Sequence, residues 1–376
     1  MADPDLSHLK KLSLHSEHER TGGRFGAFGQ WFVPLYYTSV IEEHEHVRNK
    51  VGIFDISHMG EFYVRGKAAR STINQWMTND AGKLFPGRAI YSPVCRETGG
   101  IVDDIVVFEE DPENFLMVVN AANIDKDFAW FQSHLKGDAT LENRSAEIAL
   151  FAVQGPLSRA LVSKFFGIDL NQISYYHFVK INSSYGRLVL SETGYTGEEG
   201  FEIFCPILNA KKLWMDLFKV GKEFDLKPIG FGARDTLRLE SKFLLYGHDM
   251  NDETSPLEAG LGWTIGWSKE NFIGKQALET ERARGSKRKL MGFELLDRGI
   301  AREESPVYLN GKQIGKVTSG TFSPTLKQSI GLAYISAEFA QIGQDLEIEV
   351  RNKSHKARLV KTPFYKRLKS VSKEAS

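Results

Sequence analysis

The chain has 376 residues, of which 41% are hydrophobic and 26% charged, enough apolar material for two or three domains. Lys plus Arg and Asp plus Glu both number 48, so the basic excess typical of nucleic-acid-binding proteins is absent. The two cysteines exclude a disulfide scaffold and favour a reducing compartment. No apolar run is long enough to span a membrane, and the N-terminus lacks the apolar core of a signal peptide, so we expect a soluble cytoplasmic protein.

Strands and helices are predicted to alternate through roughly the first 250 residues, without the period of a repeat protein. Residues 22–37 indicate extended chain and turns, and Ser39 is suited to cap a helix that Gly52 would end. A strand is predicted over 60–64, and the turn residues between 87–95 and 99–108 predict a β-hairpin. Further strands are predicted over 114–120 and 146–155, and a second hairpin over 187–206. Helices are predicted over 68–80, 124–135, 210–224 and 232–247, the last with Leu239, Phe243 and Tyr246 on one stripe.

The composition changes near residues 279–289, a charged segment that we interpret as a linker. Beyond it the chain shows short strands separated by turns. This pattern predicts a small antiparallel barrel as a separate C-terminal domain.

Two adjacent acids, Asp103 and Asp104, interrupt an apolar, β-branched run in GGIVDDIVVF. Successive side chains of a strand point to opposite faces, so one of the two carboxylates would enter an interior or a pocket. Taken alone, this pattern slightly favours a turn or sheet edge with both acids in solvent.

The segment GYTGEEGFE, residues 194–202, combines a glycine-rich loop with the start of an alternating strand. Glu202 shares one face of that strand with Phe204. A carboxylate beside an aromatic ring suits the paired N–H donors of a flat heterocycle. On local sequence alone, a solvent-facing strand is the stronger interpretation.

Three further groups have both a structural and a functional interpretation. Arg234 and Arg238 are helix neighbours that suit either an anion clamp or a salt-bridge network with Asp235. His44 and His46 point in different directions on a helix, so a solvated face is favoured over a metal site. His58 follows Ser57 without any nucleophile motif, and it is equally consistent with a structural role and with lining a pocket.

Several segments occur in order along the chain: FDISHMGEFYVRG, RAIYSPVCRETGGIVDDIVVF, FLMVVNAANIDKDF, ALFAVQGP, GYTGEEGFEIF, GARDTLRLES, LLYGHDM and TSGTFSPTLKQSIGLAYI. Together they closely resemble the glycine cleavage system T-protein, the aminomethyltransferase family. The match runs from about Leu12 to Tyr365. The resemblance implies an α+β fold, a three-domain cloverleaf around a central folate channel. Two interleaved α/β subdomains are expected in residues 1–280 and an antiparallel β-barrel in residues 286–376.

The resemblance also implies a reaction and its partners. An aminomethyl group arrives on the lipoyl arm of the H-protein, ammonia leaves, and the one-carbon unit passes to tetrahydrofolate as 5,10-methylenetetrahydrofolate. The expected partners are therefore lipoylated H-protein and tetrahydrofolate, the latter as co-substrate, without metal, nucleic acid or membrane, and we expect a monomer. Because H-proteins are generally acidic, basic side chains around the channel mouth are predicted to dock the H-protein.

The resemblance assigns roles to single residues. Asp104 matches the critical acid of the family, where a fixed carboxylate in a poorly hydrated channel would stabilise positive charge that develops on the migrating carbon. Asp103 is then expected to point away and to be structural. Glu202 matches the acid that holds the pterin ring. The remaining matches at the folate site are Met59, Tyr91, Asn120, Tyr175, Tyr195 and Arg234.

The sequence departs from the family pattern at some positions, and two alternative functions have to be considered. Phe243 stands where some members carry a tyrosine, and GGRFGAFGQW differs from the usual family pattern near the entrance. A folate-dependent demethylase of a sulfonium or N-methyl compound remains possible on the same scaffold, because function resides in the site. A non-catalytic folate-binding relative linked to iron–sulfur assembly is disfavoured, because this chain has no cysteine near Gly274.

Overall fold

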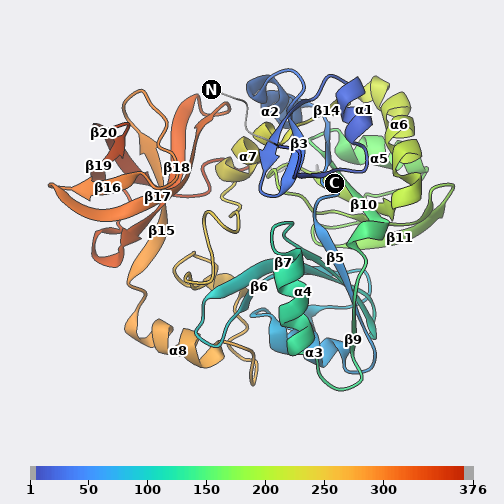
Figure 1. Cartoon of the computed structure of the whole chain (residues 1–376), viewed down its shortest axis with the longest axis horizontal. Helices are drawn as coiled ribbons and strands as arrows, with labels where there is room; N and C mark the ends of the chain where they lie inside the picture. The colour runs from blue at the N-terminus through green and yellow to red at the C-terminus, as the bar shows by residue number, and fades with distance from the viewer. Residues whose placement is uncertain (1–5, 368–376) are drawn as a thin grey trace, which may run out of the picture.

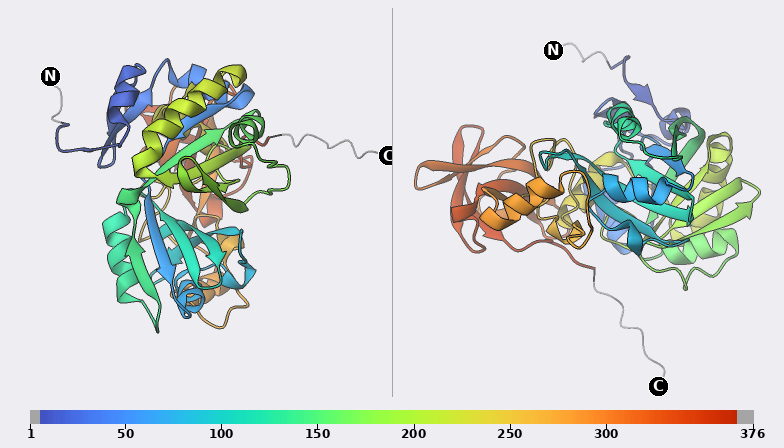
Figure 2. Two further views of the ribbon diagram at one scale, coloured as in Figure 1. Left: turned by 90° about the vertical axis from the view of Figure 1, so that its right-hand side faces the viewer. Right: turned by 90° about the horizontal axis from the view of Figure 1, so that it is seen from below.

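Three lobes surround a central region in the computed structural model, which describes residues 6–367 (Figures 1 and 2). One lobe is built on a six-stranded sheet, the second on a five-stranded sheet and the third on a closed six-stranded barrel. The expected three-domain α+β cloverleaf with a C-terminal antiparallel barrel is confirmed. No helix among the described residues is both long and apolar enough to cross a membrane.

The six-stranded sheet has the order β11-β12-β13-β10-β4-β14. Its central strand β10 is apolar on both faces, because it lies between two layers. Ala149, Phe151 and Val153 pack in a core with helices α5 and α6. Leu150 and Ala152 face the other way, into a core shared with the five-stranded sheet. The bounds are β4 (Gly52–Asp55), β10 (Ile148–Gln154), β11 (Phe178–Ser183), β12 (Gly186–Ser191), β13 (Gly200–Pro206), β14 (Lys227–Pro228), α5 (Ser158–Phe166) and α6 (Ala210–Gly221).

The five-stranded sheet is inserted between β4 and β10, which explains how the first two lobes interleave along the chain. Its order is β6-β7-β8-β5-β9, with all pairs antiparallel. Helices α3 and α4 contribute Ile73, Trp76 and Phe131 to the core on one face, and the other face joins the shared core. The bounds are β5 (Gly60–Arg65), β6 (Ala89–Cys95), β7 (Ile101–Asp111), β8 (Asn114–Val119), β9 (Thr140–Asn143), α3 (Ala69–Trp76) and α4 (Ile124–Ser133).

The barrel closes in the order β15-β18-β17-β16-β19-β20 around its own apolar core. Helix α8 (Lys275–Arg284) precedes it, so only residues 285–287 of the predicted linker lack regular structure. The division into residues 1–280 and 286–376 stays a prediction. The bounds are β15 (Arg288–Leu295), β16 (Pro306–Leu309), β17 (Lys312–Ser323), β18 (Gln328–Ser336), β19 (Asp345–Val350) and β20 (Lys353–Val360).

The remaining elements are a small three-stranded sheet, three helices and short 3₁₀ turns. A small sheet has the order β1-β3-β2. The Ser39 side chain accepts a hydrogen bond from the Glu42 amide, as predicted, but α2 ends at Asn49, because Gly52 already begins β4. The bounds are β1 (Lys10–Lys11), β2 (Arg24–Phe28), β3 (Trp31–Tyr36), α1 (His15–Arg20), α2 (Val40–Asn49) and α7 (Phe231–Glu240). Short 3₁₀ turns occupy η1 (Ala81–Lys83), η2 (Ser145–Glu147), η3 (Ile207–Asn209), η4 (Lys222–Phe224), η5 (Gly262–Thr264) and η6 (Ala337–Phe339).

Helix α7 is shorter than predicted. It ends at Glu240, and Lys242 adopts a left-handed conformation with φ of 54°. The Phe243 amide then donates back to the Arg238 carbonyl at 2.9 Å, a closure typical of helix C-termini. The expected stripe of Leu239, Phe243 and Tyr246 is therefore wrong, and the last two lie in the loop that follows the helix.

The prediction of a solvated face for His44 is also wrong. His44 is fully buried, its ring nitrogens bonded to Thr236 on α7 at 2.7 Å and to Thr325 of the barrel at 2.9 Å. These partners are distant in sequence, so no local pattern reveals them. Cys95 and Cys205 are buried and unbridged, as small core residues are expected to be.

Candidate functional site

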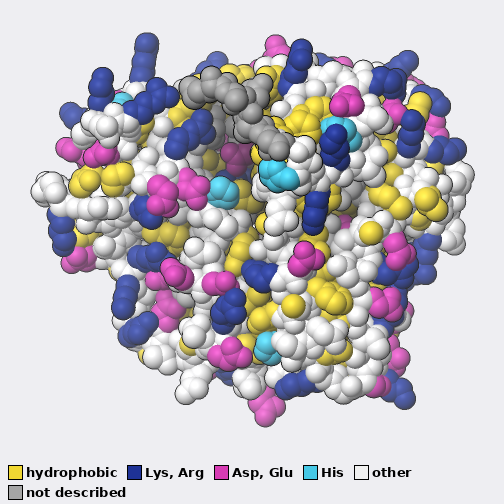
Figure 3. Space-filling view, viewed as in Figure 1, with side chains coloured by type: hydrophobic (Ala, Val, Ile, Leu, Met, Phe, Trp, Pro, Cys, Tyr) yellow, Lys and Arg dark blue, Asp and Glu magenta, His cyan; other side chains and the backbone are white. Residues whose placement is uncertain are grey.

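A cavity of about 540 Å³ lies where the lobes meet. Its walls come from strands β6, β7, β8 and β13, from helix α7 and from the loops around residues 193–195, 241–248 and 259–263. Figure 3 shows hydrophobic side chains gathered between the lobes near the centre of one face. The volume falls within the range of about 300–1,000 Å³ that is usual for small-molecule sites.

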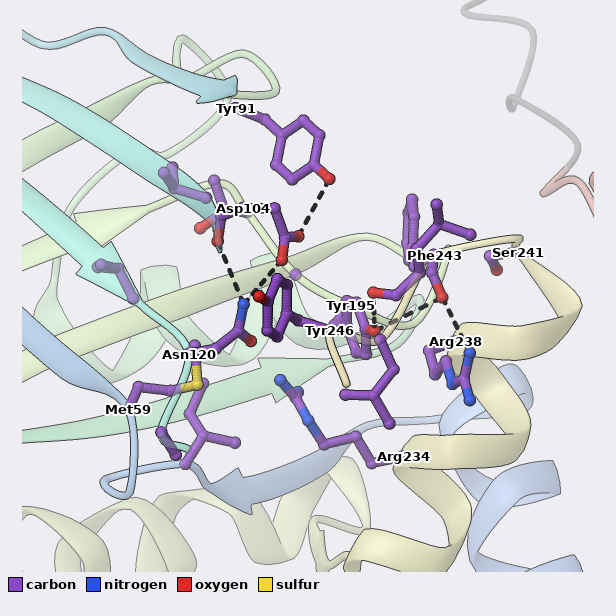
Figure 4. A pocket seen from close by; sticks show the side chains of 18 of the residues that line it. Met59, Tyr91, Asp104, Asn120, Tyr195, Arg234, Arg238, Ser241, Phe243 and Tyr246 are labelled. Atoms are coloured by element: carbon purple, nitrogen blue, oxygen red, sulfur yellow. Dashed lines mark hydrogen bonds between the residues drawn. The ribbon is translucent and has the colours of Figure 1, made fainter. Parts of the chain in front are cut away.

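Asp104 reaches this cavity from β7, and its carboxylate is held from two sides (Figure 4). The Tyr91 hydroxyl donates to Oδ2 at 3.0 Å, and the Asn120 side-chain amide donates to Oδ1 at 2.7 Å. Tyr91 comes from β6, while Asn120 directly follows β8, so neighbouring strands of one sheet supply both donors. The carboxylate is thereby fixed in orientation.

Burial, and after it the negative charge of Asp103, raise the pKa of Asp104 to about 7. Asp103 is fully buried and does not line the cavity. Its carboxylate accepts from the Asn120 amide nitrogen at 3.0 Å, from Asn120 Nδ2 at 2.8 Å and from Asn123 Nδ2 at 2.7 Å. A carboxyl that titrates near neutrality can both accept and return a proton at working pH.

A third acid, Asp127 on α4, is also fully buried. Burial, and after it the charge of Asp103, raise its pKa to about 11, so Asp127 is protonated at neutral pH. The one cation beside it that the structure describes is Lys126, whose Nζ lies 3.7 Å from Oδ1 and 3.0 Å from the Tyr246 hydroxyl. Protonation of Asp127 removes one like charge from the neighbourhood of Asp103 and Asp104.

Glu202 lines the cavity from β13, opposite Ser191 of β12. The Thr193 hydroxyl donates to its Oε2, and burial raises its pKa. The solvent-facing position favoured by the local sequence is therefore wrong. The reason is tertiary, because the five-stranded lobe and α7 close over this end of the strand.

Arg234 projects from α7 into the cavity, and its guanidinium lies 4.7 Å from the centre of the Tyr195 ring. Tyr195 in turn stacks on Phe243 with ring centres 5.6 Å apart, which fixes the ring that the arginine covers. Arg238 is different. It is held by Asp235 at 2.8 Å and Asp249 at 2.6 Å, so it belongs to a salt-bridge network.

Apolar and aromatic groups complete the lining. Met59 and His58 both contribute, and His58 packs edge-on against the rings of Phe28 and Phe231. Burial, and after it the charge of Arg234, lower the pKa of His58 to about 3, so its imidazole is neutral. Tyr175 lies toward solvent with 54% of its surface exposed.

The structure thus brings all eight predicted site residues to one cavity. They are Met59, Tyr91, Asp104, Asn120, Tyr175, Tyr195, Glu202 and Arg234. Sequence reasoning missed Thr193, Lys242, Tyr246 and Trp263, which also line it. Trp263 stacks on Tyr91 with ring centres 6.2 Å apart and is 71% exposed. The sequence around Trp263 shows no local signal of this contact.

Comparisons with known proteins agree with this geometry. Sequence models of the GCVT N-terminal domain and of the glycine cleavage T-protein C-terminal barrel domain match residues 14–269 and 288–366. An aminomethyltransferase of Desulfitobacterium hafniense is 45% identical over 96% of this chain and 100% of its own length. One from Geobacillus sp. is 46% identical with the same coverage. The crystal structure of the glycine cleavage system aminomethyltransferase T from Bartonella henselae superposes with a TM-score of 0.89 at 31% identity, covering 95% of this chain and 98% of that one.

Proposed function

The chain belongs to the glycine cleavage T-protein family and is an aminomethyltransferase, and from this premise we propose its substrates and the residues that act on them. The donor is the aminomethyl group on the lipoyl arm of the glycine cleavage H-protein. The acceptor is tetrahydrofolate, and the products are ammonia, dihydrolipoyl H-protein and 5,10-methylenetetrahydrofolate. We further propose that the protein works in the cytoplasm as a monomer.

One observation carries this proposal. The carboxylate of Asp104 is fixed by Tyr91 and Asn120 at the wall of a largely apolar cavity. When ammonia leaves the aminomethyl group, positive charge develops on the carbon that remains. An oriented carboxylate in a poorly hydrated site stabilises such charge far better than water does. We assign Asp104 as the catalytic residue on this basis.

The remaining cavity residues fit a pterin and its attached ring. Glu202 is held by Thr193 with one edge toward the cavity, where it can accept two N–H bonds from a flat heterocycle. The faces of Tyr91, Tyr175 and Tyr195 are suited to stack on planar rings. We therefore propose Glu202, Arg234, Tyr91, Asn120, Tyr175, Tyr195 and Met59 as the folate-binding residues.

Tetrahydrofolate supplies the secondary amines that take up the carbon. The protein positions these amines and supplies the carboxyl group of Asp104. Because the pKa of Asp104 is raised to about 7, its carboxyl can accept a proton from an attacking amine and later return it. The lining of the cavity is rich in apolar and aromatic side chains, which limits the water that can reach this carboxylate, and the imidazole of His58 adds no charge.

The direct test is to mix the chain with aminomethyl-loaded H-protein and tetrahydrofolate, and to measure ammonia and methylenetetrahydrofolate. Both products should appear in equal amounts, and omission of either substrate should abolish folate product. An independent measurement is thermal unfolding with tetrahydrofolate. Ligand at about a hundred times its Kd should raise the free energy of unfolding by about 2.7 kcal/mol. Absence of both effects would refute the proposed function.

A further inference from the structure

Asp127 is a buried acid that no N–H group holds. Its side chain is fully buried, and no N–H group or hydroxyl within residues 6–367 donates to either carboxyl oxygen. The ammonium of Lys126 lies 3.7 Å from Oδ1, and it donates instead to the Val102 carbonyl and, at 3.0 Å, to the Tyr246 hydroxyl. An ionised carboxylate is costly in such a place, whereas a protonated one carries an O–H group that can donate. The titratable groups that face Asp127 are Asp103 and Asp104 of β7, Lys126 of α4 and Tyr246 of the loop that follows α7.

The acceptor for the proton of Asp127 is Asp103. The two carboxyl groups are hydrogen-bonded to each other, which requires that one of them carries a proton. Asp103 accepts three N–H bonds, two at Oδ1 from the side chains of Asn120 and Asn123 and one at Oδ2 from the Asn120 backbone. Because a carboxylate has about four acceptor positions, one position on Oδ2 is left for an O–H group. Asp103 is therefore the ionised member of the pair and Asp127 the protonated member.

One short segment of the chain brings these partners to Asp103. Asn120 follows β8, Asn123 directly precedes α4, and Asp127 lies one turn further on the same side of the helix, where its amide donates to the Asn123 carbonyl at 2.7 Å. Asn120 Nδ2 also donates to Asp104 Oδ1 at 2.7 Å (Figure 4). A chain of hydrogen bonds thus runs from Asp127 through Asp103 and Asn120 to the carboxylate at the cavity wall.

We propose that Asp127 is a positioning residue for the transfer reaction: its protonated carboxyl holds Asp103, Asp103 holds Asn120, and Asn120 holds the Asp104 carboxylate in its reactive orientation. This inference rests on the proposed function, in which Asp104 is the catalytic residue. Asp127 acts through its O–H donor and not through a charge. An amide of the same shape offers an uncharged N–H donor, so asparagine should substitute for Asp127, whereas an apolar side chain should not.

The first test compares the variants Asp127→Asn and Asp127→Leu in the assay with loaded H-protein and tetrahydrofolate. Asp127→Asn should keep kcat and the midpoint of the pH profile near 7. Asp127→Leu should lower kcat by about ten- to a hundredfold, because a small displacement of a reacting group causes losses of this size, and its Kd for tetrahydrofolate should not change. A lower pH midpoint in Asp127→Asn would show that Asp127 carries a charge. An unchanged kcat in Asp127→Leu would show that Asp127 only fills space, and either result would overturn the inference.

The second test requires neither turnover nor the leucine variant. Burial and the charge of Asp103 raise the pKa of Asp127 from about 3.8 to about 11, so its contribution to stability is full below pH 3.8 and is lost as pH rises toward 11. The melting temperature of Asp127→Asn should therefore exceed that of the parent chain by a margin that grows from about pH 5 to about pH 9. Asp125→Asn is the matched control, because Asp125 is an exposed acid in the same turn of α4, and this variant should not gain on the parent chain.

A melting temperature of Asp127→Asn below that of the parent chain, more so at high pH, would mean that Asp127 is ionised and paired with Lys126. That result would overturn the inference. If the parent chain did not turn over its substrates, the proposed function would fail, but the pH dependence of the melting temperature would still decide whether Asp127 holds the proton.

Discussion

Asp103 and Asp104, adjacent on one strand, share a single donor: Asn120 Nδ2 lies 2.8 Å from Asp103 Oδ1 and 2.7 Å from Asp104 Oδ1. Asp103 takes two further N–H bonds and stays away from the cavity, whereas Asp104 faces it. One acid therefore acts as an anchor that orients Asn120, and Asn120 orients the other. This arrangement separates the two roles and makes each of them testable.

Replacing Asp104 by Asn should reduce turnover by at least about a hundredfold, the usual scale for loss of a positioned acid–base group. The amide keeps the shape of the carboxyl, so the bonds to Tyr91 and Asn120 can persist. Folding should not suffer. The pKa of Asp104 is raised, so its contribution to stability is full below its unfolded value of about 3.8 and is lost as pH rises through about 7. The melting temperature of the variant should therefore exceed that of the parent chain at pH 8 and approach it at pH 5.

The pH dependence of kcat/KM should report Asp104 as well. If the carboxylate form is required, activity should rise with pH toward a midpoint near 7. Asp103→Asn removes the like charge that helps to raise this pKa, so the midpoint should move to lower pH. The same change also weakens the acceptor of three N–H bonds and should lower the melting temperature. A midpoint that does not move would mean that Asp103 has no electrostatic influence on the reacting acid.

Glu202→Gln should weaken tetrahydrofolate binding by about ten- to a hundredfold, because a neutral amide replaces a charged acceptor of two N–H bonds. The volume is unchanged, so the cavity should persist. The Kd is measured by titration calorimetry, with Glu110→Gln as control, since Glu110 carries a partly buried carboxylate that does not line this cavity. Equal Kd values for both variants and the parent chain would remove Glu202 from the folate site.

Arg48 ties the lobes together and gives a stability prediction. Its guanidinium lies 2.7 Å from Glu240 and 2.9 Å from Glu198, and over the Tyr365 ring at 4.0 Å. Arg48→Met removes the guanidinium that bridges two buried carboxylates and should cost about 3–5 kcal/mol in the free energy of unfolding. The control Arg65→Met breaks a solvent-accessible pair with Glu142 and should cost less than about 1 kcal/mol. The free energies of unfolding are measured with denaturant. Similar losses for the two variants would contradict the conclusion that Arg48 holds the lobes together.

The ion pair between Arg48 and Glu240 should also affect how stability changes at low pH. Burial would raise the pKa of Glu240, but the hydrogen bond and charge of His44 and the charge of Arg48 outweigh it and lower the pKa to about 2. The stabilisation from Glu240 is therefore present above its usual value of about 4.5 and is lost as pH falls toward 2. In Arg48→Met the loss of stability between pH 5 and 3 should be smaller than in the parent chain.

Local sequence patterns predict many of the strands of this protein. Strand alternation, apolar runs and turn residues indicate the two hairpins, β10 and the barrel strands, because these patterns reflect faces that must be buried whatever the partner. The order of the motifs was enough to assign the family. The eight residues that this resemblance named all line one cavity. A strand period also requires that Asp103 and Asp104 point apart.

Only the tertiary structure decided which environment each side chain meets. Local sequence placed Glu202 and His44 in solvent, but both are covered by elements far away in the chain, such as α7 and the barrel. It extended α7 through Gly247, yet the helix ends at Glu240, just before Lys242 turns left-handed beside the cavity. Burial and the charges of other elements set protonation and helix ends here, and those depend on residues that meet only after folding.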